Sequence, residues 1–368
     1  MKKRIYLDNN ATTPLDPTVL DAMIAELAAL PHNPSSFHSF GQEGKKVLSQ
    51  SRSTIANCLG VKSSEILFTS GGTEGLNLLI RGLDTRHIVT TAIEHAAIHH
   101  TVESLSAQVT TLPVDTHGAP YPTTLPAGAT LLILSAVNSE TGVKIDLETW
   151  ASLAKRAGIP FIVDSVALLG KEPFTIPDGV TGMAFSAHKF HGPKGVGFIY
   201  LRTGTPLTPL ITGGGQEKNL RGGTENLPAI VGVTRAIELL TEENPFPYLQ
   251  SLRKLFESEL LREIPDLEIN GDGPRIANTS NLYFPGVEGE SLLIALDMEG
   301  IAASHASACA SGALEPSRIL LGMGYSKERA ASSLRFSFSR MNTPEEIKKA
   351  TETVASLVKR LRMPFLQI

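Results

Sequence analysis

The chain has 368 residues, of which 42% are hydrophobic and 19% charged, and its formal net charge is −4. This length predicts about two domains with a large apolar core, and the mild acidity provides no basic surface for nucleic acid. The two cysteines, Cys58 and Cys309, are too few for a disulfide framework and indicate a reducing, cytoplasmic environment. Because no apolar run is long enough to span a bilayer, we expect neither a membrane nor a nucleic acid among the partners.

Short apolar runs alternate with helical segments in the first part of the chain. Strands are predicted at 65–69, 87–91, 130–137, 160–163, 182–186 and 197–201, and helices at 75–83, 93–105 and 147–157. Continuous apolar strands separated by helices predict a mostly parallel sheet that is covered on both faces. After residue 247 a helix at 248–263 leads into a mixed region. We therefore expect an α/β protein with a large domain at 15–247 and a smaller α/β domain formed by 1–14 and 248–368.

Two short runs carry the strongest chemical signal. Lys189 follows the apolar strand at 182–186, and a lysine that leaves a buried sheet has a lowered pKa and can form a Schiff base with an aldehyde. Cys309 lies in a run of small residues at 306–312, where a thiolate can be exposed as a nucleophile. Taken alone, Lys189 also fits a solvated loop end, and Cys309 fits a small buried hydrophobe. Together they suggest sulfur chemistry on pyridoxal phosphate.

Cys58 shows a different pattern from Cys309. It lies in a helical stretch at 52–59, where Ile55, Cys58 and Leu59 fall at helical spacing on one apolar face. A thiol on a buried face is inert. We therefore expect Cys58 to be structural.

Other residues occupy positions that suit the same cofactor. Gly72 and Thr73 lie in a turn between a strand and a helix, which fits a phosphate cradle and a plain tight turn equally well. Asp164 ends a strand, where a carboxylate can pair with a protonated pyridine nitrogen or cap a helix. His95 follows another strand and is either a ring-stacking proton shuttle or a structural histidine. Arg335 alternates with apolar neighbours, which favours an inward arginine that binds a carboxylate or forms a structural ion pair.

These residues belong to longer stretches that resemble one family almost from end to end. The stretches are Tyr6–Pro14, Asn33–Ser36, Phe68–Glu74, Glu94–His95, Ser186–Lys189, Gly192–Gly195, Arg221–Thr224, Ser307–Cys309 and Leu314–Ser317, followed by Arg335. On them the chain resembles cysteine desulfurases of the NifS/IscS type, which belong to the class V aminotransferases. The resemblance implies the fold of a fold-type I pyridoxal-phosphate transferase, with the cysteine run in the smaller domain.

The resemblance also implies roles for single residues. Lys189 would hold pyridoxal 5'-phosphate and remove the α-proton of L-cysteine, His95 would stack on the ring, and Cys309 would take the sulfur as a persulfide. The implied cofactor-binding set is Gly72, Thr73, Asp164, Ser186, His188, Lys189 and Thr224, the last from the neighbouring subunit. Arg335 and Asn33 would hold the substrate carboxylate. The implied enzyme is a homodimer that releases L-alanine and passes sulfur to an acceptor protein, such as an iron–sulfur scaffold or a thiolation enzyme.

Two positions depart from the family pattern. Ser139 stands where the family usually has the second asparagine of Asn-Asn-Glu, and Ala167 stands where it usually has glutamine. Each change weakens a polar contact to the ring hydroxyl of the cofactor, worth about 0.5–1.5 kcal/mol per hydrogen bond, unless Asn138 fills the role. The departures keep three alternatives open: a selenocysteine lyase, another aminotransferase-like enzyme, and a degenerate non-catalytic homologue. The sequence predicts no metal site.

Overall fold

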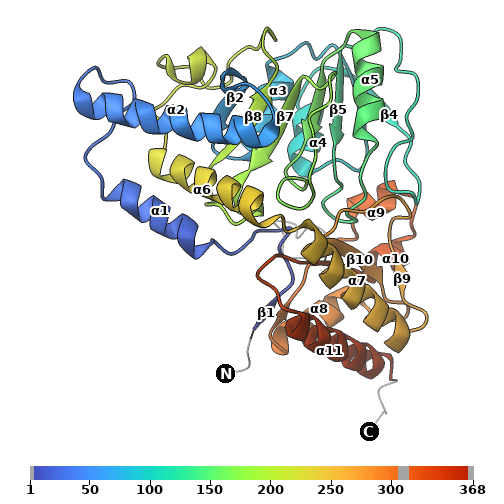
Figure 1. Cartoon of the computed structure of the whole chain (residues 1–368). Helices are drawn as coiled ribbons and strands as arrows, with labels where there is room; N and C mark the ends of the chain where they lie inside the picture. The colour runs from blue at the N-terminus through green and yellow to red at the C-terminus, as the bar shows by residue number, and fades with distance from the viewer. Residues whose placement is uncertain (1–3, 306–314, 364–368) are drawn as a thin grey trace.

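The computed structural model describes residues 4–305 and 315–363, so Cys309 lies outside the described residues. Within these ranges a seven-stranded sheet has the order β2-β8-β7-β6-β5-β3-β4 (Figure 1). Its strands are β2 (Ile66–Thr69), β3 (His87–Thr91), β4 (Gln108–Leu112), β5 (Leu131–Ser135), β6 (Phe161–Asp164), β7 (Gly182–Ser186) and β8 (Gly197–Leu201). Strand β8 runs antiparallel to both neighbours, whereas β7, β6, β5, β3 and β4 are parallel. The predicted mostly parallel α/β sheet is confirmed.

Both faces of this sheet are buried under helices. One apolar cluster joins the sheet to α3 (Gly72–Arg81) and α4 (Ala96–Glu103). The other joins it to α2 (Ser39–Leu59), α5 (Leu147–Ala157) and α6 (Leu227–Glu243). Successive strand residues point to opposite faces, so Leu131 and Ile133 enter the first cluster while Leu132 and Leu134 enter the second. This two-sided burial explains the unbroken apolar runs of the strands.

A second body lies beside the first and has its own apolar cluster. Its elements are β1 (Ile5–Tyr6), α7 (Phe246–Glu263), β9 (Glu268–Ile269), β10 (Thr279–Tyr283), α8 (Gly289–Met298), β11 (Ile301–Ala302), α9 (Arg318–Gly322), α10 (Lys327–Ala331), β12 (Ser333–Ser337) and α11 (Pro344–Arg362). Ile5 and Leu7 from the N-terminal segment pack with residues between 252 and 358 in that cluster. On this basis we propose the division into a large domain at 15–247 and a small domain from the remaining residues.

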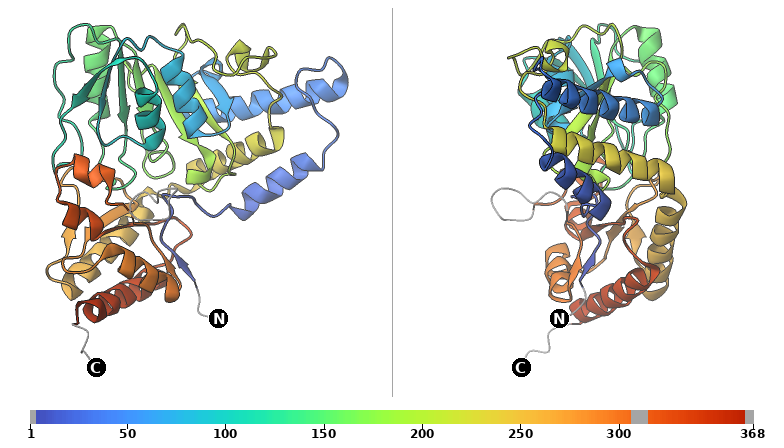
Figure 2. Two further views of the ribbon diagram at one scale, coloured as in Figure 1. Left: turned by 180° about the vertical axis from the view of Figure 1, so that it is seen from behind. Right: turned by 60° about the vertical axis from the view of Figure 1, so that its left-hand side comes forward.

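The sequence pattern predicts only part of the helical structure. It omits α6 and α1 (Pro17–Leu27) and gives only residues 52–59 of α2. Figure 2 shows α1 and α2, in blue, extending to one side of the sheet. The predicted helix at 93–105 begins instead at Ala96, because His95 is the residue that caps it. No helix in the described ranges is both long and apolar enough to cross a membrane.

Candidate active site

A cavity of about 950 Å³ opens at the carboxyl ends of the parallel strands. Asp164 ends β6, Ser186 ends β7 and His95 follows β3, so the parallel order brings their side chains to one edge of the sheet. The predicted residues that line the cavity are Gly72, Thr73, His95, Asn138, Asp164, Ser186, His188, Lys189 and Arg335. Asn33 and Thr224 are exposed and do not line it in this chain.

Lys189 ends a short 3-10 turn (Ala187–Lys189) that directly follows β7. Its Nζ donates to the carbonyl oxygens of Asn10, at 2.5 Å, and of Ala11, at 3.0 Å. Burial lowers the pKa of Lys189 to about 8, and the nearby Arg335 cation lowers it further, while Asp164 acts in the opposite direction. The neutral amine, which is the nucleophilic form, is therefore the main form above about pH 8.

This lowered pKa predicts how the lysine responds to pH. The reaction of cofactor-free protein with an aromatic aldehyde should speed up as pH rises through about 8, because the neutral amine accumulates. Arg335→Met removes a cation that lowers the pKa of Lys189, so its midpoint should move to higher pH. Stopped-flow absorbance against pH measures both midpoints, with Lys194→Met as the control variant. A wild-type midpoint near the ordinary lysine value of about 10.4 would contradict the burial argument.

Asp164 and His95 lie on opposite sides of the space above β6. The Asp164 carboxylate accepts from the Val166 N–H at 2.9 Å, and burial raises the pKa of Asp164 while His95 and Lys189 oppose that effect. His95 caps α4 through its Nδ1, which accepts from the Ala97 N–H at 3.0 Å. Because Nδ1 accepts, the neutral ring carries its proton on Nε2. Burial lowers the pKa of His95, which favours this neutral form.

The start of α3 provides an anion-binding cradle. No side chain caps this helix, so its first N–H groups remain available. A Cβ at Gly72 would lie 2.4 Å from Val166 Cγ2, so a side chain larger than hydrogen would crowd the cradle. Ser186 and His188 line the same space. Burial and the neighbouring lysines lower the pKa of His188 to about 4, which leaves its ring neutral.

Arg335 lies on β12, with buried Leu334 and Phe336 on either side of it in the sequence. Its Nη2 forms an ion pair with Asp8 Oδ1 at 2.8 Å, and its Nη1 donates to the Ser139 carbonyl at 3.1 Å. Its buried Nε has no partner among the described residues. That unpaired donor remains available for a carboxylate. Asn33 instead accepts from the Ser35 N–H and remains exposed.

The amide of Asn138 is used within its own turn. Its Nδ2 donates to the Ile93 carbonyl, and its Oδ1 accepts from the N–H groups of Glu140 and Thr141. Ser139 and Ala167 both line the cavity. The geometry thus gives Asn138 a role in the main-chain turn, whereas positions 139 and 167 are placed where longer polar side chains would reach into the cavity.

The double variant Ser139→Asn with Ala167→Gln should bind pyridoxal phosphate more tightly. Each new hydrogen bond should add about 1 kcal/mol, which is roughly a fivefold change in Kd. Dialysis followed by cofactor titration measures Kd, and Ser139→Ala is the control that adds no donor. An unchanged Kd in the double variant would mean that another group already binds the ring hydroxyl.

The structure also brings two ionisable residues to the site that the sequence did not single out. Lys171 is buried, and its Nζ donates to the Lys189 carbonyl at 2.6 Å; burial lowers its pKa to about 7. Glu94 is buried beside Asp164, and burial raises its pKa to about 7. The carboxylate of Glu94 accepts from the Ser135 N–H and hydroxyl. A lysine directly after the apolar stretch 166–170 was the available signal for Lys171.

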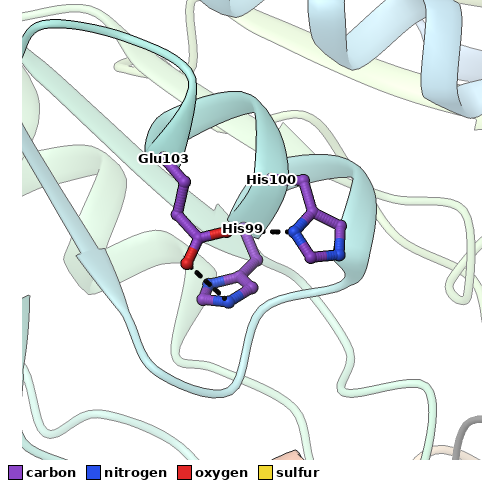
Figure 3. Close-up of side chains that lie close together, drawn as sticks. All are labelled: His99, His100 and Glu103. Carbon is purple, nitrogen blue, oxygen red and sulfur yellow. Dashed lines mark hydrogen bonds and ion pairs between the residues drawn. The ribbon is translucent and has the colours of Figure 1, made fainter.

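A cluster of His99, His100 and Glu103 on α4 lies on the same cavity wall (Figure 3). His99 Nε2 lies 3.2 Å from one carboxylate oxygen of Glu103, and His100 Nδ1 lies 3.0 Å from the other. Both oxygens are therefore already engaged by the imidazoles, and the three side chains are partly exposed. Such pairs stabilise a helix by about 0.3–0.5 kcal/mol, and we assign no metal to this cluster.

Comparison with known proteins places this cavity in a family. The family model for aminotransferase class V matches residues 5–350. The chain belongs to this family. It is 41% identical over 374 residues to a cysteine desulfurase of Nostoc sp., covering 97% of this chain and 94% of that protein. It is 40% identical over 379 residues to the cysteine desulfurase IscS of Dictyoglomus turgidum, covering 98% and 96% respectively.

The solved structures agree with this assignment. A NifS-like protein superposes with a TM-score of 0.89 at 34% sequence identity, covering 98% of this chain and 100% of that one. A second NifS-like protein, from Rickettsia africae, gives a TM-score of 0.88 at 31% identity. The resemblance to NifS/IscS-type proteins and the expected fold are confirmed.

Proposed function

We propose that this protein is a cysteine desulfurase that uses pyridoxal phosphate, converts L-cysteine into L-alanine and carries the sulfur on Cys309. The observation that carries the proposal is the convergence of Lys189, Asp164, His95 and Arg335 on one cavity. Similarity over nearly the whole chain to proteins named cysteine desulfurase supports the substrate.

The residues present fit the cofactor. The uncapped start of α3, with Ser186 and His188, suits the phosphate, and the buried Asp164 carboxylate suits a protonated pyridine nitrogen. Lys189 offers a largely neutral amine to the aldehyde. When bound, pyridoxal phosphate accepts the negative charge that forms at the α-carbon of the substrate. Thr224 of a second subunit is the proposed further phosphate ligand.

The protein's own groups then perform the remaining steps. Arg335 binds the substrate carboxylate through its unpaired Nε, and Lys189 Nζ takes the α-proton. The Cys309 thiolate attacks the substrate sulfur, so an S–S bond forms as the substrate Cβ–S bond breaks, and the electron pair of the broken bond remains with the carbon skeleton. Proton transfer to that skeleton yields alanine, and an acceptor protein, such as an iron–sulfur scaffold or a thiolation enzyme, collects the persulfide sulfur.

The test is the release of products from L-cysteine in the presence of a thiol reductant. Sulfide and alanine should appear in equal amounts, and the purified protein should be yellow. A colourless protein that makes no alanine after cofactor addition would indicate the degenerate homologue. Much faster turnover of selenocysteine, with little sulfide from cysteine, would indicate the lyase.

A homodimer is the proposed assembly, and α1 is its proposed contact. Leu20, Ile24 and Leu27 form one apolar face of α1, with exposed fractions of 45%, 52% and 68%. A second copy of the chain would cover this face and bring Thr224 to the cavity of its neighbour. Ile24→Glu with Leu27→Glu should therefore halve the mass measured by light scattering and weaken cofactor binding. Met298→Glu, at another exposed apolar site, is the control and should remain dimeric. A wild-type monomer with full cofactor would overturn the assembly.

A further inference from the structure

Arg318 joins two segments of the chain that meet at the cavity. It is the first residue of α9, and its guanidinium donates to the carbonyl oxygens of Ala92 and Glu94. These carbonyls lie in the turn between β3 and α4, immediately before His95. Figure 1 shows α9 beside the lower edge of the sheet, where the small domain meets the large one. Arg318 therefore ties the small domain to the turn that carries His95.

The helix that presents Arg318 is itself firmly supported. The Ser317 hydroxyl caps α9 by accepting from the Leu320 N–H at 3.1 Å, and it donates to the buried carboxylate of Glu140. Ile319 and Leu320 pack against Ile93, the residue between the two carbonyls that Arg318 binds. Polar and apolar contacts thus hold α9 against the same turn, so the position of Arg318 is set independently of its own hydrogen bonds.

Arg318 also contributes charge near the imidazole. In the described part of the chain no carboxylate forms an ion pair with it, since its printed partners are the two carbonyls. The charged groups that face His95 are Asp164 on β6, Lys189 after β7, Arg318 on α9 and Arg335 on β12. Burial lowers the pKa of His95 most strongly, Asp164 raises it, and the three cations lower it. Arg318 therefore favours the neutral ring.

We propose that Arg318 is a positioning residue for His95, holding the β3–α4 turn against the start of α9 so that the neutral imidazole keeps its place over the cavity. The inference rests on the proposed function, because it gives His95 a part in the site. A forked guanidinium suits this role because it can reach two carbonyls at once, whereas a lysine ammonium is a compact point charge. Arg318 also follows the cysteine-bearing stretch in the sequence, so one residue connects the return of that stretch to the His95 turn.

Two substitutions separate the hydrogen bonds from the charge. Arg318→Met removes both, and Arg318→Lys keeps the charge without the fork. We expect Arg318→Met to lower kcat for alanine formation about 10- to 100-fold, as for a misplaced group near the reacting atoms, with KM for cysteine changed less than about threefold. NMR of histidine-labelled protein should show a raised pKa for His95, because a nearby cation is gone. Arg318→Lys should lower kcat while the pKa of His95 stays near its wild-type value.

Arg329→Met is the matched control. Arg329 lies on the neighbouring helix α10, binds Glu268 and Asn270, and does not line the cavity. Its loss should lower thermal stability without moving the pKa of His95. Wild-type kcat together with an unchanged pKa of His95 in Arg318→Met would overturn the proposal, as would equal losses of kcat in Arg318→Met and Arg329→Met. If Arg318→Met does not fold, Arg318→Lys decides: wild-type kcat would overturn the role. A wild-type protein that makes no alanine rejects the proposed function instead, while the pKa of His95 still tests the positioning.

Discussion

Replacing Lys189 with alanine should abolish alanine formation and remove the visible absorbance of covalently held cofactor. The amine is buried in the cavity with a pKa of about 8, so it is suited both to bind an aldehyde and to take a proton. Loss of a general base alone costs about 10²- to 10⁴-fold in rate, and loss of the covalent attachment adds to this. Absorbance spectra and an alanine assay, both with added pyridoxal phosphate, measure the two effects.

Two other lysines make this prediction specific. Lys194 follows in the same loop, and Lys171 is a buried amine that donates to the Lys189 carbonyl. Borohydride reduction of the wild-type protein, followed by peptide mapping, should find the cofactor on Lys189. The assignment fails if the label falls on Lys171 or Lys194, or if Lys189→Ala keeps the absorbance. Lys194→Ala is the control, and it should retain both colour and turnover.

Replacing Cys309 with alanine should leave a yellow protein that binds cysteine but forms neither persulfide nor alanine. The proposed reaction needs a thiolate to accept the sulfur, and no other residue of the proposed site has a thiol. Spectral change on adding cysteine measures binding, and mass spectrometry detects the persulfide. Alanine formation at the wild-type rate would refute sulfur transfer to Cys309 and indicate direct elimination with Lys189 as the base.

Cys58 provides the control for the thiol chemistry. It is half-buried on α2, packs against the apolar cluster beneath the sheet, and burial raises its pKa. The thiol is therefore protonated and a poor nucleophile at neutral pH. Cys58→Ala should cost about 1 kcal/mol of unfolding free energy and leave turnover unchanged. The partial exposure differs from the fully buried face that the helical spacing predicts.

The sequence by itself determined the sheet strands and the site residues that end them. The apolar runs that lead to Asp164 and Lys189 predict buried strands, and a polar residue at such an end must lie at the carboxyl edge of a parallel sheet. The longer stretches around these residues determined the family. Helix α1 escaped prediction because half of its apolar face is exposed, so the simple pattern of a buried face does not describe it.

Only the tertiary structure decided how the charges of the site are arranged. Asp8 and Arg335 form their ion pair across 327 positions, and the carbonyls of Ala92 and Glu94 meet Arg318 across 226 and 224. The raised pKa of Glu94 likewise depends on burial beside Asp164, which lies on another strand. Local patterns record which residues a segment buries, but pKa values and ion pairs depend on the distances between segments and on the water excluded when they pack together.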